Sequence, residues 1–305
     1  MDIINHPITP EKGKAWHFKS HQYFTKQAHN VVNEYIRNFS NEGDVILDPF
    51  CGTGVTAIEA LSLKRKAIMM DINPLATFIT YWTCRKINTD KIQNVFGFLK
   101  FKVEKIIKEY YELDFNEAQK IKPSYWYPSK IKLPQNSDFK YVEDLYTSRQ
   151  LASYSLLFHE INNIEEEEER EFMKYVFSAT MFKVNLTYWT NANRGEEGGG
   201  SSIFGAYRYH KPIKINELDV WKNFYNRFKY VIRGKKIWND LTHDIDVNNN
   251  LTVITGSVLD LEKYIPQNSI DYIYTDPPYG GNIAYLDLSI MWNAWLGFDV
   301  SQESR

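Results

Sequence analysis

The sequence predicts an α/β fold, with a parallel sheet and a large, mainly helical insertion between its second and third strands. Short apolar runs typical of buried parallel strands lie in both the first and the last third of the chain. A glycine-containing loop joins the first run to a helical pattern, which is the order of a strand–helix–strand unit. A long stretch of helical periodicity separates the two groups of runs and indicates the inserted region.

Four apolar runs predict the strands of the sheet. They are DVILD (44–48), AIMMD (67–71), LTVIT (251–255) and IDYIYTD (270–276). Between the first two runs, the segment VTAIEALSL has the apolar spacing of a helix. The first two strands and this helix form a crossover unit, which we expect to be right-handed.

Helical patterns dominate the residues between the second and third runs. The segment 90–115 predicts one helix, 146–186 predicts two helices joined at an acidic run, and 215–241 predicts another. Residues 191–205 are too rich in Gly and Ser for regular structure. A last helix is predicted at 285–298, after the fourth strand.

These patterns divide the chain into two expected domains. Residues 1–79 and 251–305 form the core, and residues 80–250 form the helical insertion. A chain of 305 residues is long enough for one large core with such an insertion.

Composition excludes several classes of protein. The only cysteines, Cys51 and Cys84, exclude a disulfide framework and a cysteine-rich zinc site, and they predict a reducing, cytoplasmic compartment. The seven histidines show no metal-ligand spacing, so no metal site is predicted. No apolar run has the length of a membrane span, and the N-terminal stretch lacks the apolar segment of a signal peptide. A net charge of −2 identifies no partner.

The loop after the first strand, DPFCGTG, predicts a ligand site. Gly52 and Gly54 allow a sharp turn and close approach of a ligand, and the following helix presents free N–H groups. Gly52, Gly54 and Ala57 fit the dinucleotide fingerprint, with Asp71 in place to accept hydrogen bonds from a ribose. NAD and S-adenosylmethionine both remain candidates, and a tight turn without a ligand is the alternative. The absence of a GKS or GKT sequence excludes a P-loop.

Two further acids follow strands at the same predicted edge of the sheet. Asp71 ends the second strand, where its alternative role is a helix N-cap. Asp260 follows the third strand and could contact an adenine amino group, or it could be a solvated loop residue.

The segment DPPY after the fourth strand has a pattern suited to an amino group on a nucleobase. A carboxylate oxygen of Asp276 and the carbonyl of Pro277 can accept hydrogen bonds from the two amino hydrogens. Pro277 and Pro278 fix φ and offer no competing N–H donor. Tyr279 can stack on a base swung out of a helix. A simple turn is the alternative, because Asp and Pro favour turns.

Together, DPFCGTG, DINPLA and DPPY resemble the amino-group DNA methyltransferases, above all the adenine-specific DNA methylases of bacterial and archaeal modification systems. The segments YFTKQAHNVVNEYI, LYTSRQLASYSLLFHEI and GGNIAYLDLSIMWNAWL also resemble parts of that family. The resemblance implies a Rossmann-like methyltransferase core, S-adenosylmethionine as methyl donor, DNA as partner and N6 of adenine as acceptor, with N4 of cytosine as the other amino target. It assigns the target base to Asp276, Pro277, Pro278 and Tyr279, and the cofactor to Phe24, Thr25, Asp48, Phe50, Cys51, Gly52, Thr53, Gly54, Asp71 and Asp260.

Other activities compete with this interpretation. An RNA guanine-N2 methyltransferase also carries DPPY, and a non-catalytic nucleic-acid-binding subunit could retain the fold. An NAD-dependent oxidoreductase fits the glycine loop but leaves DPPY without a role. Cys51 is expected to be a small packing residue rather than a nucleophile, because methylation of an amino group needs no thiol.

Two features concern partners. The stretch 207–238 interleaves aromatic and basic side chains, which suits either a phosphate-tracking surface or an amphipathic helix with a basic outer face. The resemblance implies a sheet of seven strands, and only four strands are predicted here. We therefore expect a missing segment or a second polypeptide to complete the sheet, and a chain that is poorly active alone.

Overall fold

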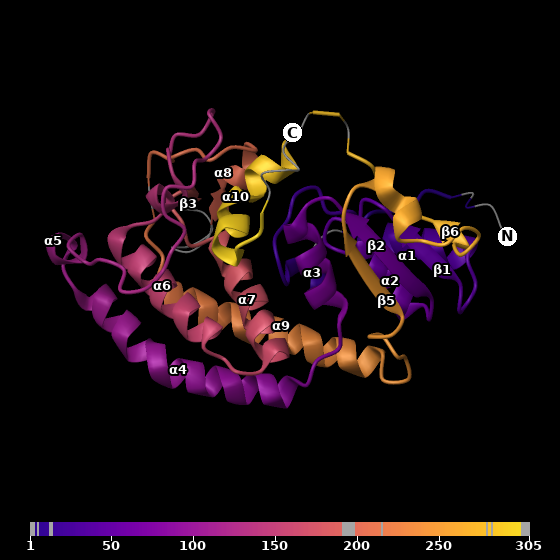
Figure 1. Cartoon of the computed structure of the whole chain (residues 1–305), viewed down its shortest axis with the longest axis horizontal. Coiled ribbons are helices and arrows are strands. Elements are labelled where there is room, and N and C mark those ends of the chain that lie inside the picture. The colour runs from indigo at the N-terminus through magenta and orange to yellow at the C-terminus, as the bar shows by residue number, and fades with distance from the viewer. Residues whose placement is uncertain are drawn as a thin grey trace. The chain divides into compact units, whose positions relative to one another are not determined.

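The computed structural model describes residues 4, 6–11, 15–190, 199–214, 216–278, 280–281 and 283–299. They form two compact units (Figure 1). The sheet unit comprises the residues up to Ile87 together with Arg233–Ile283. The helical unit comprises Asn88–Ile232 and the residues from Ala284 onward. The boundaries of these units differ from those of the expected domains. Residues 233–250, expected in the insertion, belong to the sheet unit, and the last helix, expected in the core, belongs to the helical unit.

The sheet unit is built on four parallel strands in the order β5-β2-β1-β6, which confirms the predicted α/β class. Leu47 of β1 lies opposite Ile68 of β2 and Ile273 of β6. The strands are β1 (Val45–Asp48), β2 (Lys66–Asp71), β5 (Leu251–Thr255) and β6 (Tyr272–Ile273).

Strand β6 is shorter than the run 270–276 that predicted it. The Asp271 carboxylate accepts a hydrogen bond from Val45 N at 2.8 Å, and Tyr274 N donates to Leu47 O at 3.1 Å. Pairing ends there, ahead of two prolines that have no N–H for a ladder.

The helices of the sheet unit surround a core in which α2 is buried from Val55 to Leu61. Asn73 starts α3 as its N-cap, accepting a hydrogen bond from Leu75 N at 3.1 Å, with Pro74 at the first position. The segments are η1 (Trp16–Lys19), α1 (His29–Phe39), α2 (Val55–Ser62), α3 (Pro74–Cys84) and η4 (Val258–Lys263).

The C-terminal end of α3 is capped by side chains from far along the chain. The Lys235 amino group is fully buried and donates to Thr83 O at 2.8 Å and Arg85 O at 2.7 Å. Trp238 Nε1 donates to Cys84 O at 2.5 Å. These bonds satisfy carbonyls that a helix end leaves without intrahelical partners.

The helical unit contains the helices that the sequence predicted between the second and third strands. Residues 163–166 separate the two helices of the segment 146–186, and the acidic run enters the first turn of the second, where negative charge favours the helix dipole. The elements are α4 (Thr89–Glu112), α5 (Phe115–Ala118), η2 (Val142–Leu145), α6 (Ser148–Asn162), α7 (Glu167–Met181), β3 (Tyr188–Thr190), β4 (Gly199–Ser201), α8 (Ser202–Gly205), α9 (Val220–Leu241) and α10 (Tyr285–Leu296).

The prediction of an irregular segment at 191–205 is wrong for its second half. Strand β4 pairs antiparallel with β3, and α8 follows directly. A Cβ on Gly200 would lie 2.8 Å from the Trp189 ring, so glycine here permits close packing of the hairpin rather than disorder. Residues 191–198 lie outside the described residues.

Helix α10 is part of the core of the helical unit. Trp292 Nε1 donates to Ser178 O at 2.9 Å, and Trp295 Nε1 donates to Tyr146 OH at 3.1 Å. The Tyr209 hydroxyl donates to Leu288 O at 2.7 Å. The two tryptophans are fully buried. Their burial explains why α10 belongs to the helical unit, although the residues just before it in the chain belong to the sheet unit.

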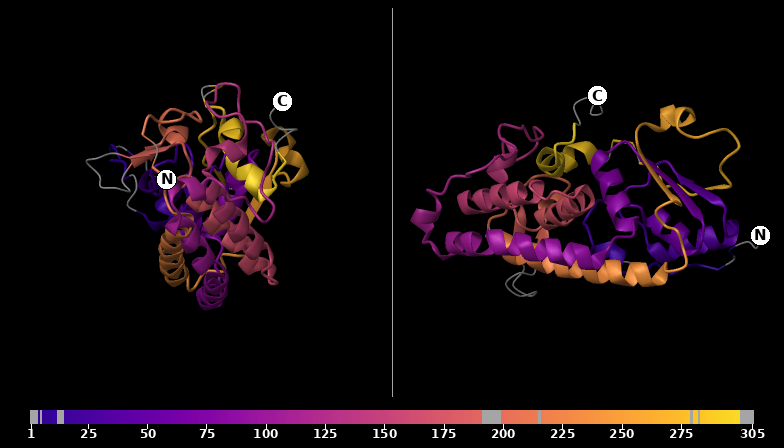
Figure 2. Two further views of the ribbon diagram at one scale, coloured as in Figure 1. Left: turned by 90° about the vertical axis from the view of Figure 1, so that its left-hand side faces the viewer. Right: turned by 60° about the horizontal axis from the view of Figure 1, so that its bottom comes forward.

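Most aromatic residues of the stretch 207–238 are buried or half-buried, whereas Tyr207 is exposed. Phe96 of α4 stacks on Phe228 of α9 at 3.7 Å between ring centroids, where the two helices run side by side (Figure 2). Lys222 and Lys229 are exposed on the other side of α9. The amphipathic interpretation of this stretch is therefore confirmed, and its binding to a phosphate backbone stays a prediction.

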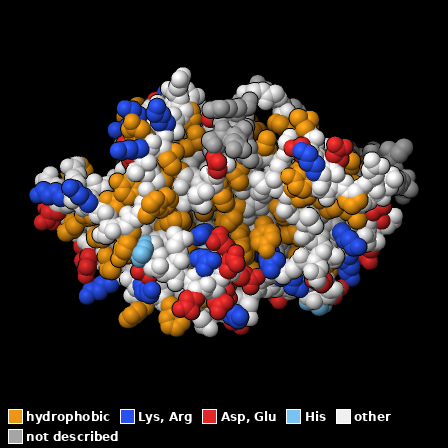
Figure 3. All heavy atoms as spheres, viewed as in Figure 1, with side chains coloured by type: hydrophobic (Ala, Val, Ile, Leu, Met, Phe, Trp, Pro, Cys, Tyr) orange, Lys and Arg blue, Asp and Glu red, His pale blue; other side chains and the backbone are white. Residues whose placement is uncertain are grey.

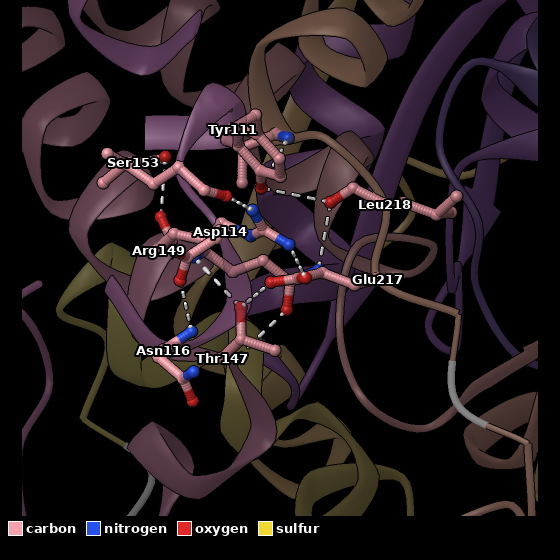
Figure 4. A network of polar contacts seen from close by, with 11 residues as sticks. Tyr111, Asp114, Asn116, Thr147, Arg149, Ser153, Glu217 and Leu218 are labelled. Atoms are coloured by element: carbon pink, nitrogen blue, oxygen red, sulfur yellow. Dashed lines mark hydrogen bonds and ion pairs between the residues drawn. The ribbon is translucent and has the colours of Figure 1, made fainter. Parts of the chain in front are cut away.

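A polar network ties α4, α6 and the segment before α9 together (Figure 4). Glu217 accepts hydrogen bonds from Arg149 and from the Thr147 hydroxyl, while the Tyr111 hydroxyl donates to Leu218 O at 3.2 Å. Burial alone would raise the pKa of Glu217, but the bonds from Arg149 and Thr147 hold it below its usual value. The network fixes the segment that enters α9.

Within the described part of the chain, none of the helices combines the length and the apolar character that crossing a bilayer requires.

Candidate active site

The carboxyl ends of β1, β2 and β6 bring the predicted acids to one edge of the sheet. Asp48 ends β1, Asp71 ends β2, and Asp276 follows β6 by three residues. Because all the strands are parallel, these ends share the edge at which α/β proteins bind ligands. The charges of Asp71 and Asp276 both act on Asp48, which shows that the three carboxyl groups are neighbours.

Asp48 is buried and holds the glycine loop. Its oxygens accept hydrogen bonds from Phe50 N at 3.1 Å and from the Thr56 hydroxyl at 2.6 Å. Burial raises the pKa of Asp48 to about 7, against the lowering effect of these two bonds. The side chain thus joins the loop to the first turn of α2.

Asp71 holds the same loop from the neighbouring strand. One carboxylate oxygen accepts from Gly52 N and the other from Asn73 N, each at 2.9 Å. Asn73, not Asp71, is the N-cap of α3, so the alternative helix-cap role of Asp71 is wrong. These two bonds fix the Asp71 carboxylate against the loop at the end of β2.

The two loop glycines are required for different reasons. Gly54 has φ +74°, and a Cβ there would lie 2.7 Å from Thr80 Cγ2. Gly52 has φ +52°, but a Cβ there would meet only a Tyr23 ring atom, at 3.8 Å. Gly54 therefore lets the loop pack against α3, whereas Gly52 leaves space beside the backbone that a ligand can approach.

The other predicted residues of the loop differ in exposure. Phe50 is half-buried, while Cys51 and Thr53 are buried. Cys51 packs in the core of the sheet unit, with its Sγ 3.7 Å from Thr80 Oγ1. Burial raises the pKa of the Cys51 thiol well above its usual value, which keeps it protonated and agrees with its exclusion as a nucleophile.

The segment before α1 lies against the loop through a residue that sequence reasoning missed. The Tyr23 hydroxyl accepts a hydrogen bond from Asn73 Nδ2 at 2.9 Å, and its ring faces Gly52. Of the two predicted residues, Phe24 is buried, and Thr25 is exposed with φ +47°. Asn73 had a sequence signal, since Asn before Pro is a typical helix start, whereas Tyr23 had only its place beside Phe24.

The segment 276–279, which the sequence predicted to hold the target base, is described in part. Asp276 is half-buried, Pro277 and Pro278 are exposed, and Gly280 N donates to Pro278 O at 3.0 Å in a tight turn. Tyr279 lies outside the described residues. The structure thus leaves this segment accessible at the end of β6.

Asp260 lies in η4, where its carboxylate is 2.5 Å from Lys263 Nζ. This exposed ion pair fits the solvated-loop alternative. Its predicted contact with an adenine amino group stays a prediction.

The face of the molecule drawn in Figure 3 carries side chains of both charges. On the face drawn in Figure 3, Lys and Arg side chains lie among Asp and Glu side chains. This agrees with a net charge of −2 and gives no evidence for a single basic surface.

Comparisons with known proteins match both the loop region and most of the chain. A family model described as DNA methylase, of the N6 and N4 methyltransferase type, matches residues 8–80, which include the glycine loop and Asp71. A Type II methyltransferase from Kocuria varians, M.MvaI, is 23% identical over 85% of this chain and 52% of its own length. A Type II methyltransferase from Methanocaldococcus jannaschii, M.MjaII, is 22% identical over 91% of this chain and 62% of its own length.

A third relative aligns over a shorter part. The Type II methyltransferase M1.MboII from Moraxella bovis is 34% identical over 20% of this chain and 28% of its own length. The chain spans about half to three-fifths of the length of the first two relatives, at 52% and 62%. These matches confirm the predicted resemblance to the DNA amino-methyltransferases.

Proposed function

We propose that this protein is an S-adenosylmethionine-dependent DNA methyltransferase that methylates an exocyclic amino group, N6 of adenine, as part of a modification system in the cytoplasm. The observation that carries the proposal is the loop between β1 and α2, held by two acids beside an open glycine. The names of the relatives, all Type II methyltransferases, support the reaction class.

The charge of the site favours a sulfonium cofactor over NAD. Asp48, Asp71 and Asp276 gather acidic groups at this edge, and Gly52 N already donates to Asp71. A pyrophosphate would meet like charge and find that N–H occupied, whereas a cationic sulfonium would be attracted. The competing dinucleotide interpretation therefore has no support in this geometry.

The residues present fit S-adenosylmethionine. The Asp71 carboxylate, at the end of β2, has the chemistry to accept hydrogen bonds from ribose hydroxyls, and the space beside Gly52 admits the ligand next to the backbone. Half-buried Phe50 offers an apolar surface in the same loop. The bound cofactor would supply an electrophilic methyl group.

The segment after β6 would hold the target base. The carboxylate of Asp276 and the carbonyl of Pro277 accept hydrogen bonds from the two amino hydrogens, which orients the nitrogen lone pair toward the methyl donor. The nitrogen would take the methyl group as the bond between the methyl carbon and the sulfonium sulfur breaks, and one of these protons would pass to Asp276. Tyr279 would stack on the base.

Two surfaces are proposed to bind partners: α9 would contact DNA, and the edge of the sheet at β6 would pair with a further strand. Exposed Lys222 and Lys229 on α9 suit contact with a phosphate backbone. On β6, the outer strand of the described sheet, Ile273 is an apolar side chain that is 53% exposed. We propose that a further strand, from a longer chain or a second polypeptide, pairs with this edge.

The test separates cofactor binding from methyl transfer. Calorimetric titration with S-adenosylmethionine should show binding that Gly52→Ala weakens by tenfold or more, because the added Cβ fills the ligand's approach. Gly43→Ala is the matched control, since Gly43 also has a positive φ, of +88°, with no heavy atom of the described residues within 4 Å of an added Cβ. A folded wild-type chain that binds no S-adenosylmethionine would contradict the proposal.

Transfer is then followed with labelled cofactor on DNA and on tRNA. Asp276→Asn should retain binding and lose transfer to DNA by a factor of 100 or more, consistent with the loss of a positioned proton acceptor. Label in tRNA but not in DNA would instead identify the RNA guanine-N2 methyltransferase.

A further inference from the structure

Three side chains from separate segments of the sheet unit, two of them buried and one half-buried, lie close together. His17 comes from η1, His29 begins α1, and Glu59 lies in the middle of α2. His17 Nε2 is 3.5 Å and His29 Nδ1 is 3.6 Å from the same oxygen, Glu59 Oε1. One atom from each residue lies within 4.8 Å of the other two.

These distances fit ligands around a metal better than hydrogen bonds. A protein N–H···O hydrogen bond is normally about 2.7–3.2 Å long, so both contacts exceed it. Zinc binds imidazole nitrogen and carboxylate oxygen at about 2.0–2.2 Å, which places two ligands of a tetrahedral site about 3.4 Å apart. The observed separations match that edge of the tetrahedron.

The surroundings orient the three donors. Asn33 Nδ2 donates to Glu59 Oε2 at 2.7 Å, which leaves Oε1 to face the two imidazoles. Arg37 in turn donates to Asn33 Oδ1 at 3.1 Å. Outer-shell bonds of this kind hold carboxylate ligands in protein metal sites.

The cluster also opens on one side. His29 and Glu59 line a cavity of about 440 Å³ that His6 also borders. Nε2 of His29 is buried and has no hydrogen-bond partner within the part of the chain that the structure describes. Three protein ligands with access to a cavity match zinc sites that keep a fourth position for water or another ligand.

We propose that His17 Nε2, His29 Nδ1 and Glu59 Oε1 bind a divalent transition-metal ion, Zn²⁺, with the fourth position toward the cavity bordered by His6. The ion cross-links η1, α1 and α2. Two imidazoles with one carboxylate suit Zn²⁺ better than Mg²⁺ or Ca²⁺, which prefer all-oxygen sites. This site is not predictable from the sequence, because 11 residues separate the two histidines in the chain and no ligand spacing connects them to Glu59. The site does not depend on the proposed methyltransferase activity.

Zinc binding is tested on the full chain after dialysis against a chelator, by titration with Zn²⁺ against a chromogenic competitor. The wild type should bind one equivalent, and His29→Gln and Glu59→Gln should each weaken binding by more than about 100-fold. Asn33→Ala, which removes only the outer bond, should weaken it by about 10- to 100-fold. His243→Gln is the matched control, because His243 is an exposed histidine of the same unit and should leave the affinity unchanged.

Three further measurements show whether weaker zinc binding in a variant results from a loss of folding. Co²⁺ should give the intense visible absorption of a four-coordinate ion in the wild type and in His243→Gln, but not in His29→Gln. Circular dichroism of the metal-free variants should match that of the metal-free wild type. Zn²⁺ should raise the Tm of the wild type but not the Tm of variants that lack one of the three ligands. A wild type without saturable binding, or a folded Glu59→Gln that binds zinc like the wild type, would overturn the proposal.

Discussion

Replacing Gly54 with alanine should destabilise the sheet unit through two effects that can be measured separately. The residue sits at φ +74°, a conformation that costs an L-residue about 1–2 kcal/mol. The new Cβ would also lie 2.7 Å from the methyl group of Thr80 on α3, and overpacking of this kind costs about 1–3 kcal/mol. The expected loss in free energy of unfolding is therefore about 2–5 kcal/mol.

Thr80→Ser separates the two effects. It removes the methyl group but keeps the hydroxyl that donates to Gly52 O at 3.0 Å. Alone, this change should cost about 1 kcal/mol, as for loss of one buried methyl group. In the Gly54→Ala/Thr80→Ser double variant the shortest contact disappears. The loss in free energy of unfolding of the double variant should therefore be smaller, by about 1 kcal/mol or more, than the sum of the losses of the two single variants.

The free energies are best measured by hydrogen exchange of peptides from α2 and β1 in increasing urea, since these report on the sheet unit by itself. Gly43→Ala, at φ +88° with nothing near its added Cβ, should show the backbone cost alone. If Gly54→Ala lost no more stability than Gly43→Ala, or if the double variant were simply additive, the contact with Thr80 would not explain this glycine.

Two further predictions concern buried polar groups. Burial lowers the pKa of Lys235 to about 7, so between pH 7 and about 10.5 the unfolded chain binds a proton that the folded chain does not. The free energy of unfolding should therefore rise with pH in this window, by at most about 1.4 kcal/mol per pH unit, relative to Lys235→Met in parallel urea titrations; equal slopes would contradict the buried neutral amine. Asn293 of α10 is buried with neither amide atom hydrogen-bonded to the described residues, so Asn293→Leu should stabilise the helical unit by about 1–3 kcal/mol in urea unfolding. The control Asn185→Leu should destabilise it, because Asn185 bonds Met181 O at 2.6 Å and Thr187 N at 2.8 Å; a loss of stability in Asn293→Leu would show that its amide is satisfied.

The sequence by itself determined the elements and the motifs. Apolar runs placed all four strands of the described sheet within a few residues, and helical periodicity placed α4, α6, α7, α9 and α10. Gly52 and Gly54 were identified from the sequence because a positive φ leaves a residue-type signature at one position. Asp71 was placed at the carboxyl edge of the sheet by its position at the end of the second strand, and Asp48 was assigned only by the family resemblance. Their role with a cofactor stays a prediction.

Only the tertiary structure decided which distant residues meet. Lys235 and Trp238 cap α3, Tyr23 lies against Gly52, and α10 joins the helical unit through Trp292 and Trp295. His17, His29 and Glu59 converge from three helices. The physical reason is that secondary structure follows from local periods of two or 3.6 residues, which a sequence displays directly. A contact between segments depends on how whole elements pack, and no spacing along the chain records it.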